Sequence, residues 1–378
     1  SNTIEGKPII YWQTAVDKTV PADAAYIVLV NCRGITVQGG NPSGITLIST
    51  ANSTVSGVTV TGKGDGINLL DCTNVNIQDS VLRDGAIAIH IENSQNSTIR
   101  GNQILTQMTR GINLGNATNT LIVGNTIFNN SYAIAPSQDS ASAGTVVSQN
   151  NFTGNGYAIT VQGNMQIQNN TFTGNEQAVL CYSGANTIVD NTFTGNNRGV
   201  ILQSTGNTLK GNHFVDNADS LPIQAANFNN NVDQTNTLNG RPIVYWVNRH
   251  GETVPAEAAY VALVNCTGII AQNLILKDQP NGILLAFTEG STIKDNLIMG
   301  NGNGIYLYGA PNNQFIGNNV TGNGYAVYIS GGYVSFFWYP PMSYTPSSGN
   351  LFYHNSFAGN NQTLYDLAGA YDVGAPPS

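Results

Sequence analysis

One short phrase recurs along almost the whole chain and limits what the chain can fold into. In its clearest copies an apolar residue stands between two Asn residues, and Phe152, Phe172, Phe193 and Phe214 hold that position at steps of 20, 21 and 21 residues. Aliphatic or aromatic residues hold it elsewhere, at Val60, Val81, Ile104, Ile127, Ile275, Ile298, Val320 and Phe357. A period near 22 residues that is sustained over a chain of 378 residues predicts a solenoid of stacked coils.

Apolar residues inside each period alternate with other residues, as in Ile67-x-Leu69 and Ile89-x-Ile91. This spacing is the period of a β-strand, and no segment shows the i, i+3, i+4, i+7 stripe of a helix. Asn and Gly between the strands suit turns that need a positive φ. The sequence therefore predicts an all-β fold, a right-handed parallel β-helix with coils of about 22 residues, Asn/Gly turns and Asn side chains stacked in ladders.

A longer repeat overlies the short one. Residues 1–36 and 235–270 align without gaps at an offset of 234, and 20 of the 36 positions are identical. Both copies contain a Gly-basic-Pro-Ile-x-Tyr-Trp phrase, at Gly6–Trp12 and Gly240–Trp246. We expect two β-helical halves, residues 1–235 and 236–378, each opened by one larger coil. They are predicted to stack as one continuous rod, because a solenoid coil buries its faces only against neighbouring coils.

The composition excludes two classes of partner. Only 9% of the residues are charged, the net charge is −8 and the 13 Lys and Arg residues are scattered singly. No basic surface that could bind nucleic acid is therefore predicted. No run of about 18 apolar residues occurs, so no transmembrane segment is predicted.

The start of the chain and its sequons bear on location. Ser1-Asn2-Thr3 has neither the charged region nor the apolar region of a signal peptide. Asn-x-Ser/Thr sites recur, for example at Asn52 and Asn96. We expect the mature form of an extracellular, cell-surface protein whose signal peptide has been removed.

Residues that could carry catalysis or bind a metal are sparse. A polysaccharide hydrolase needs paired carboxylates, and no two acidic residues are adjacent in this sequence. A lyase needs an Arg base beside Asp-bound calcium, and the best trio for it in the aligned coils is Asp65, Asp84 and Arg110, with one charge from each coil. The four His and four Met residues are dispersed, with no His-x-His or Cys-x-x-Cys. These residues are His90, His213, His250, His354, Met108, Met165, Met299 and Met342. The sequence predicts no catalytic, metal or cofactor site and no enzyme, with a polysaccharide lyase or hydrolase as the alternative.

An aromatic insertion at residues 332–349 lengthens one repeat from about 22 to 37 residues. Its aromatic residues are Tyr333, Phe336, Phe337, Trp338, Tyr339 and Tyr344. A self-packed loop against the flank and a platform that stacks on sugars are two interpretations. Because exposed aromatic patches typically mark interfaces, we expect these residues to form a contact between subunits.

The cysteines occupy a recurring position. Cys32, Cys72 and Cys266 each follow the polar residue that ends an alternating strand, and Cys32 and Cys72 are two coils apart. Two coils separate Cα atoms by about 9–10 Å, whereas a disulfide needs about 4.4–6.8 Å. No intramolecular disulfide is therefore expected. We expect Cys181 in the core and the other three at the exposed rim, where they could form intermolecular disulfides.

These phrases resemble those of the NosD-type β-helix family, also called CASH repeats. The resemblance rests on the Gly6–Trp12 opening, the Val-Asn-Cys strand ending at Cys32 and the late Asn350–Phe357 phrase. It implies the β-helix fold along nearly the whole chain. The family includes a copper-site maturation factor, carbohydrate-active proteins and secreted surface proteins. The opening phrase is most similar to that of sheath or S-layer-like surface proteins of methanogenic archaea.

The function expected from these observations is structural. No helical or strongly charged segment is predicted to cap the coil stack, and an uncapped end presents unpaired strand groups to another chain. We expect a secreted protein that self-assembles through its ends and flanks into a cell-surface layer or sheath with amyloid-like resistance. Its partner is then a further copy of itself, with cell-surface glycans as a possible second partner. The alternative is a carbohydrate-binding or carbohydrate-cleaving β-helix protein.

Overall fold

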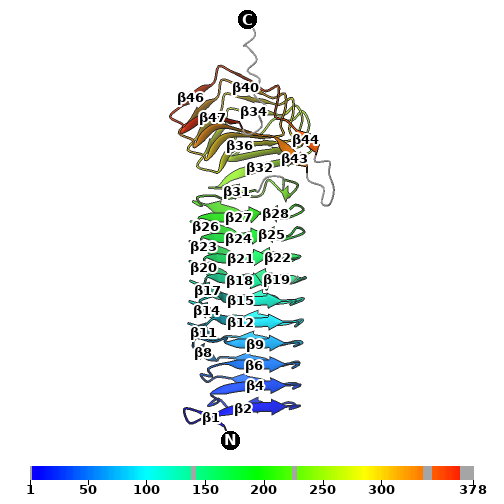
Figure 1. Cartoon of the computed structure of the whole chain (residues 1–378), viewed down its shortest axis with the longest axis vertical. Coiled ribbons are helices and arrows are strands. Elements are labelled where there is room, and N and C mark those ends of the chain that lie inside the picture. The colour runs from blue at the N-terminus through cyan, green and yellow to red at the C-terminus, as the bar shows by residue number, and fades with distance from the viewer. Residues whose placement is uncertain (1, 138–141, 224–227, 335–342, 367–378) are drawn as a thin grey trace. The chain divides into compact units, whose positions relative to one another are not determined.

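The computed structural model describes residues 2–137, 142–223, 228–334 and 343–366 (Figure 1). The chain divides into two compact units, Ser1–Gln203 and Ser204–Ser378. In the described residues all regular structure is β-strand, and no helix there could span a membrane. The predicted all-β class is therefore confirmed.

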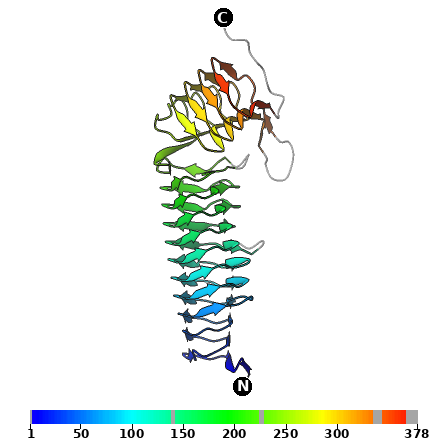
Figure 2. The same cartoon turned by 90° about the vertical axis from the view of Figure 1, so that its left-hand side faces the viewer.

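Unit 1 consists of coils whose strands stack into three sheets, which are parallel apart from the antiparallel pair β1–β2 (Figures 1 and 2). The first sheet contains β1 (Thr3–Ile4), β2 (Lys7–Gln13), β4 (Tyr26–Val30), β6 (Ile45–Ile48), β9 (Ile67–Leu70), β12 (Ile87–Glu92), β15 (Arg110–Gly115), β18 (Tyr132–Pro136), β21 (Tyr157–Val161), β24 (Gln177–Cys181) and β27 (Arg198–Leu202). The second contains β3 (Thr19–Val20), β5 (Thr36–Gln38), β7 (Thr54–Ser56), β10 (Asn76–Gln78), β13 (Thr98–Arg100), β16 (Leu121–Val123), β19 (Thr145–Ser148), β22 (Met165–Gln168) and β25 (Thr187–Val189). The third contains β8 (Thr59–Thr61), β11 (Val81–Arg83), β14 (Gln103–Leu105), β17 (Thr126–Phe128), β20 (Asn151–Thr153), β23 (Thr171–Thr173) and β26 (Thr192–Thr194).

The core of unit 1 is built from columns of like residues. In the first sheet Ile67, Ile89, Ile112 and Ile134 lie directly opposite one another in successive coils, and all are fully buried. In the third sheet the rings of Phe152, Phe172 and Phe193 stack, with centroids 4.9 and 4.8 Å apart. The strand alternation sets this pattern, because every second side chain of a strand points to the same face.

Asn side chains form the predicted ladders, and they point into the coil. Asn155 is 1% exposed, and its Oδ1 accepts hydrogen bonds from the backbone N and the Nδ2 of Asn130, both at 3.0 Å. The backbone N and the Nδ2 of Asn155 donate in turn to Oδ1 of Asn175. The ladder therefore satisfies backbone groups at the turns, where the strand pairing is interrupted.

Unit 2 repeats this architecture. Its longest series of stacked strands runs through β29 (His213–Val215), β31 (Thr237–Leu238), β32 (Arg241–Val247), β33 (Tyr260–Val264), β36 (Asn281–Ala286), β39 (Asn303–Tyr308), β42 (Tyr325–Ser330) and β47 (Gln362–Asp366). Two four-stranded sheets contain β34 (Ile270–Gln272), β37 (Thr292–Lys294), β40 (Gln314–Ile316) and β45 (Leu351–Tyr353), and β35 (Ile275–Lys277), β38 (Leu297–Met299), β41 (Asn319–Thr321) and β46 (Ser356–Ala358). The remaining strands are β28 (Thr208–Lys210), β30 (Asn231–Val232), β43 (Gly332–Val334) and β44 (Ser343–Thr345).

The turns confirm the role expected for Asn and Gly. Asn31, Asp71 and Asn265 have φ values of 50°, 54° and 50°, in the left-handed region that Asn and Asp tolerate better than most residues. The compact units divide at Gln203 and Ser204, earlier than the predicted division at 235/236, which followed the long repeat. That division and the continuous rod stay predictions.

Candidate functional site

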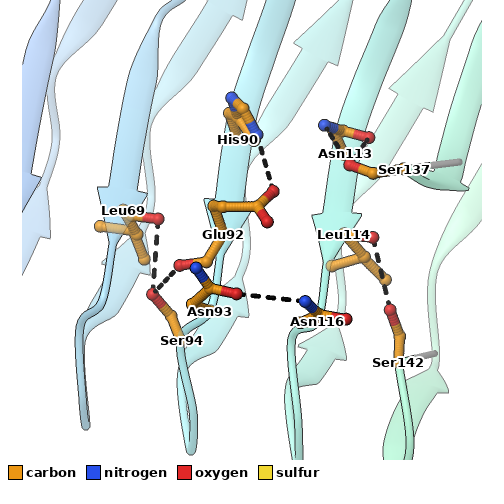
Figure 3. A network of polar contacts seen from close by, with 10 residues as sticks. All are labelled: Leu69, His90, Glu92, Asn93, Ser94, Asn113, Leu114, Asn116, Ser137 and Ser142. Carbon is orange, nitrogen blue, oxygen red and sulfur yellow. Dashed lines mark hydrogen bonds and ion pairs between the residues drawn. The ribbon is translucent and has the colours of Figure 1, made fainter. Parts of the chain in front are cut away.

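A polar network lies on β12 and β15 and on the turns that follow them (Figure 3). His90 and Glu92 are partly exposed, and Nε2 of His90 lies 3.5 Å from Oε2 of Glu92. On β15, Nδ2 of Asn113 donates to Oγ of Ser137 at 3.1 Å. His90 and Glu92 were not predicted as a pair, although alternation within one strand places residues i and i+2 on the same face.

This network can supply one acid–base pair. A His beside a carboxylate can move a proton, but a glycoside hydrolase needs two carboxyl groups about 5–9.5 Å apart. Glu92 is the only carboxylate among the ten residues drawn in Figure 3. Its side chain lies over Gly115, where an added Cβ would come within 1.9 Å of Oε2. The network therefore joins neighbouring coils and lacks the paired carboxylates of a hydrolase.

The trio singled out from the sequence does not form a site. Oδ1 of Asp84 accepts a hydrogen bond from Oγ1 of Thr106 at 2.7 Å, and Oδ2 of Asp84 lies 3.9 Å from Nε of Arg83. In the described part of the chain no hydrogen bond or ion pair joins Asp65, Asp84 and Arg110 to one another. In the residues that the structure describes, no group of three or more His, Cys, Asp or Glu side chains could hold a metal ion.

The cysteine position faces inward, so the predicted rim exposure is wrong. Cys32, Cys72 and Cys266 are 2%, 1% and 0% exposed. The Sγ of Cys32 donates to the carbonyls of Val30 and Trp12, at 3.4 and 3.5 Å. The residue before each of these cysteines has a positive φ, which bends the chain there, and the following side chain points toward the coil interior.

The thiols take the place of hydroxyls in one column. Thr50 lies between Cys32 and Cys72 in that column. Its Oγ1 donates to the carbonyls of Ile48 and Leu29, just as the thiol of Cys32 donates to two main-chain carbonyls. All four cysteines are free within this chain, and Cys181 is fully buried in the core, as expected, where burial raises its pKa to about 12. Burial also raises the pKa of Cys72 and Cys266.

We expect the folded protein to react very slowly with a thiol reagent at pH 8, and all four thiols to react in denaturant. The raised pKa values of Cys72, Cys181 and Cys266 lower the fraction of reactive thiolate at a given pH, and burial blocks access of the reagent to all four thiols. Ellman's reagent checks this result, and fast labelling without denaturant would contradict it. The intermolecular disulfide stays a prediction, although the three cysteines lack the rim exposure on which it was based. Gels run with and without reductant test it.

The aromatic insertion is anchored by a hairpin. Strands β43 and β44 pair antiparallel, and Tyr333 lies opposite Tyr344. Phe336, Phe337, Trp338 and Tyr339 lie outside the described residues. The predicted subunit contact therefore stays a prediction.

Four tyrosines that the sequence analysis did not single out gather on β39, β42 and β47. The ring of Tyr328 lies 5.2 Å from Tyr306, 5.5 Å from Tyr325 and 5.1 Å from Tyr365, between centroids. Burial raises the pKa of Tyr306 and Tyr328. Tyr306, Tyr328 and Tyr365 hold the same position in successive coils, and this recurrence in the sequence could have identified them. Clustered rings with hydroxyl groups can stack on the apolar faces of sugars.

A depression of about 650 Å³ in unit 2 has a wall of mixed charge that includes Asp216, Arg241, Lys277 and Asp278. The guanidinium of Arg241 is committed to main-chain carbonyls, including that of Ala258 at 2.9 Å. The arginine therefore holds two coils together.

The two copies of the long repeat have the same local structure and a different exposure. The hairpins β1–β2 and β31–β32 have equivalent registers, with Thr3 opposite Pro8 and Thr237 opposite Pro242. In the first copy Ile4 is 41% exposed and Tyr11 is 61% exposed.

In the second copy the equivalent residues, Leu238 and Tyr245, are 4% and 5% exposed. Tyr245 donates a hydrogen bond to the carbonyl of Phe228, and burial raises its pKa. The equivalent side chains are thus exposed in the first copy and buried in the second.

Two family profiles match the sequence. The profile described as "Periplasmic copper-binding protein (NosD)" matches residues 138–251 and 250–372, and the profile described as "Right handed beta helix region" matches residues 25–172. Together they agree with the parallel sheets and the stacked coils. No curated protein matches the chain in sequence.

Solved structures show only remote likeness. A PL6-family polysaccharide lyase from Pseudopedobacter saltans is 13% identical, with 97% of this chain and 94% of that chain covered and a TM-score of 0.42. PfbA, a surface adhesin of Streptococcus pneumoniae, is 12% identical, with 86% of this chain and 91% of that chain covered and a TM-score of 0.34. Pectate lyase Pel9A is 13% identical, with 56% of this chain covered and a TM-score of 0.39, and the chain spans 62% of its length, less than two thirds.

Proposed function

The chain belongs to the NosD family of right-handed β-helix proteins, and from this premise we propose that it is a secreted structural protein that assembles with its own copies into a cell-surface layer or sheath. The description of the family as periplasmic supports a location outside the cytoplasm. In this proposal the protein is not an enzyme, and its ends and flanks make the contacts.

The observation that carries the proposal is the regular stacking of like coils, whose strands pair parallel and in register from one coil to the next. The backbone pairing that joins coils within the chain can join coils of two chains in the same way. A charged fraction of 9% offers little repulsion to such contacts.

We expect the purified full chain to form assemblies whose share rises with protein concentration and which resist SDS. Backbone pairing between β-helical copies would extend the inter-coil ladders, and stacked ladders of this kind resist dissociation. Sedimentation velocity over a hundredfold concentration range and negative-stain electron microscopy check this result. Dispersed monomers throughout that range would contradict the proposal.

Carbohydrate binding is the second candidate, and the tyrosine cluster around Tyr328 is the observation that favours it. The same experiment separates the two functions. A glycan-binding protein should stay soluble and monomeric at high concentration, whereas a structural protein should be recovered in large particles.

A further inference from the structure

One turn in unit 2 carries a residue that its own backbone conformation does not favour. Strands β32, β33, β36 and β39 stack in register, and the residues that directly follow them are Asn248, Asn265, Phe287 and Gly309. All four have a positive φ, of 57°, 50°, 51° and 58°. Asn and Gly tolerate this left-handed conformation, whereas a bulky side chain rarely adopts it. The turn itself therefore does not explain why phenylalanine stands at position 287.

Aromatic contacts hold the ring of Phe287 in place. Its centroid lies 5.4 Å from that of Tyr308, at an interplanar angle of 89°. The ring of Tyr308 also packs edge to face on Phe228, with centroids 5.2 Å apart. Strained backbone of this kind clusters at sites that bind ligands, where the surrounding packing supports it.

Phe287 and Phe228 line a hollow of about 570 Å³ in unit 2. Small-molecule sites typically have volumes of roughly 300–1,000 Å³. The wall also includes two valines and the two asparagines of the same turn column, Val247, Val264, Asn248 and Asn265. Nδ2 of Asn265 donates to Oδ1 of Asn248 at 2.6 Å, so the two amides hold each other at the rim.

The hollow carries a single charge. Among the described residues that line it, Glu289 alone is ionised at neutral pH. Glu289 is exposed, and its side chain forms no ion pair in the described part of the chain. Two other depressions of unit 2 differ, because basic residues also line them, Arg241 and Lys277 in one and Arg249 in the other. The hollow beside Phe287 therefore favours a cation over an anion.

The chemistry of the wall favours one kind of cation. A metal ion needs several oxygen, nitrogen or sulfur ligands, and no cluster of three or more His, Cys, Asp or Glu side chains occurs in the described ranges. An aromatic ring attracts an ammonium group that lies within about 6 Å of its centroid, and quaternary ammonium compounds are recognised in this way. Their methyl groups also suit a wall that contains valine and phenylalanine side chains.

We propose that this hollow binds a small organic cation with a methylated ammonium group, of which choline is an example. The ammonium group lies between the ring of Phe287 and the carboxylate of Glu289. Phe228, which is 2% exposed, supports the aromatic wall through Tyr308. The site belongs to unit 2 alone and does not depend on self-assembly.

Calorimetric titration of the full chain with choline at low salt tests the site. We expect saturable binding with a Kd on the order of 1 mM or lower, as one ring and one carboxylate can supply. Dimethylbutanol, the neutral analogue in which carbon replaces nitrogen, has the same shape without the charge. We expect it to bind at least about tenfold more weakly. Equal binding of the analogue, or no saturable binding below about 10 mM choline, would overturn the proposal.

Glu289→Gln removes the charge with little change in size, and we expect it to weaken choline binding by about tenfold. Glu257→Gln is the matched control, because Glu257 is another exposed carboxylate of unit 2 and lies outside the hollow. The control should bind choline as the unchanged protein does. Equal losses in both variants would point to attraction by the net charge of −8 and would contradict a defined site.

Phe287→Asn tests the ring and introduces the residue that the same turn column has at Asn248 and Asn265. We expect the variant to keep the circular dichroism spectrum of the folded chain and to bind choline at least about tenfold more weakly. A folded variant with unchanged affinity would overturn the role of the ring. The comparisons of Glu289→Gln with its control and of choline with its neutral analogue decide the proposal if this variant does not fold.

A sugar is the competing occupant, because aromatic rings also stack on sugars. Glucose and N-acetylglucosamine are therefore titrated under the same conditions. We expect neither to displace choline. Sugar binding that is tighter than choline binding and is lost in Phe287→Asn would assign the hollow to carbohydrate and overturn the proposal.

Discussion

Phe172→Ala is expected to lower the free energy of unfolding by about 3–5 kcal/mol, the usual cost of removing a large buried ring. Phe172 is fully buried between Phe152 and Phe193, with ring centroids 4.9 and 4.8 Å away. Its removal leaves a cavity and takes a stacking partner from each neighbouring coil. Urea unfolding followed by circular dichroism measures the change.

Phe128→Ala is the matched control. Phe128 lies on β17 of the same sheet, two strands away from β23, and is 43% exposed, so its loss opens no closed cavity. We expect the control to change the unfolding free energy by less than about 1 kcal/mol. Equal losses for the two variants would show that the phenylalanine column does not hold the coils together.

Asn155→Leu is expected to cost about 2–6 kcal/mol although leucine has a similar size. The change removes the acceptor for the backbone N–H of Asn130 and the donor to the carbonyl of Ile127. Each buried polar group left without a partner costs about 1–3 kcal/mol. Hydrogen exchange at Asn130, together with the urea midpoint, measures the local and the global effect.

The control for this prediction is Asn151→Leu in the same coil. Asn151 is exposed on β20, and its side chain only accepts a hydrogen bond from Thr153 at 3.1 Å. We expect a change of less than about 1 kcal/mol. If Asn155→Leu were equally mild, the buried ladder would contribute little to stability.

The sequence by itself determined the repeating fold of this protein. The Asn-x-Phe spacing and the alternation within each coil are local patterns, and every coil repeats them. Backbone pairing and burial of one coil against the next follow from those patterns whatever the chemistry of the outer face. The Asn ladders, the positive φ at Asn31 and the free Cys181 in the core were predictable for the same reason.

The candidate site was far less predictable. Alternation puts His90 and Glu92 on one face of a strand, but their contact depends on side-chain conformation. Tyr306 and Tyr365 lie beside Tyr328 because successive coils place equal positions side by side, and Tyr325 joins them from the same strand as Tyr328. Asp65, Asp84 and Arg110 looked related in the aligned coils, yet their side chains make no contact with one another in the described structure.

Only the tertiary structure decided which way the residues after the turns face and which copy of the long repeat has its apolar side chains buried. Cys32 follows a residue with positive φ, which turns its thiol inward to main-chain carbonyls, and a sequence pattern does not show that direction. The long repeat makes the same point at larger scale. Ile4 and Leu238 have the same local structure but differ tenfold in exposure, 41% against 4%. Burial depends on what packs against a strand, and neighbours far along the chain or on another copy supply that packing.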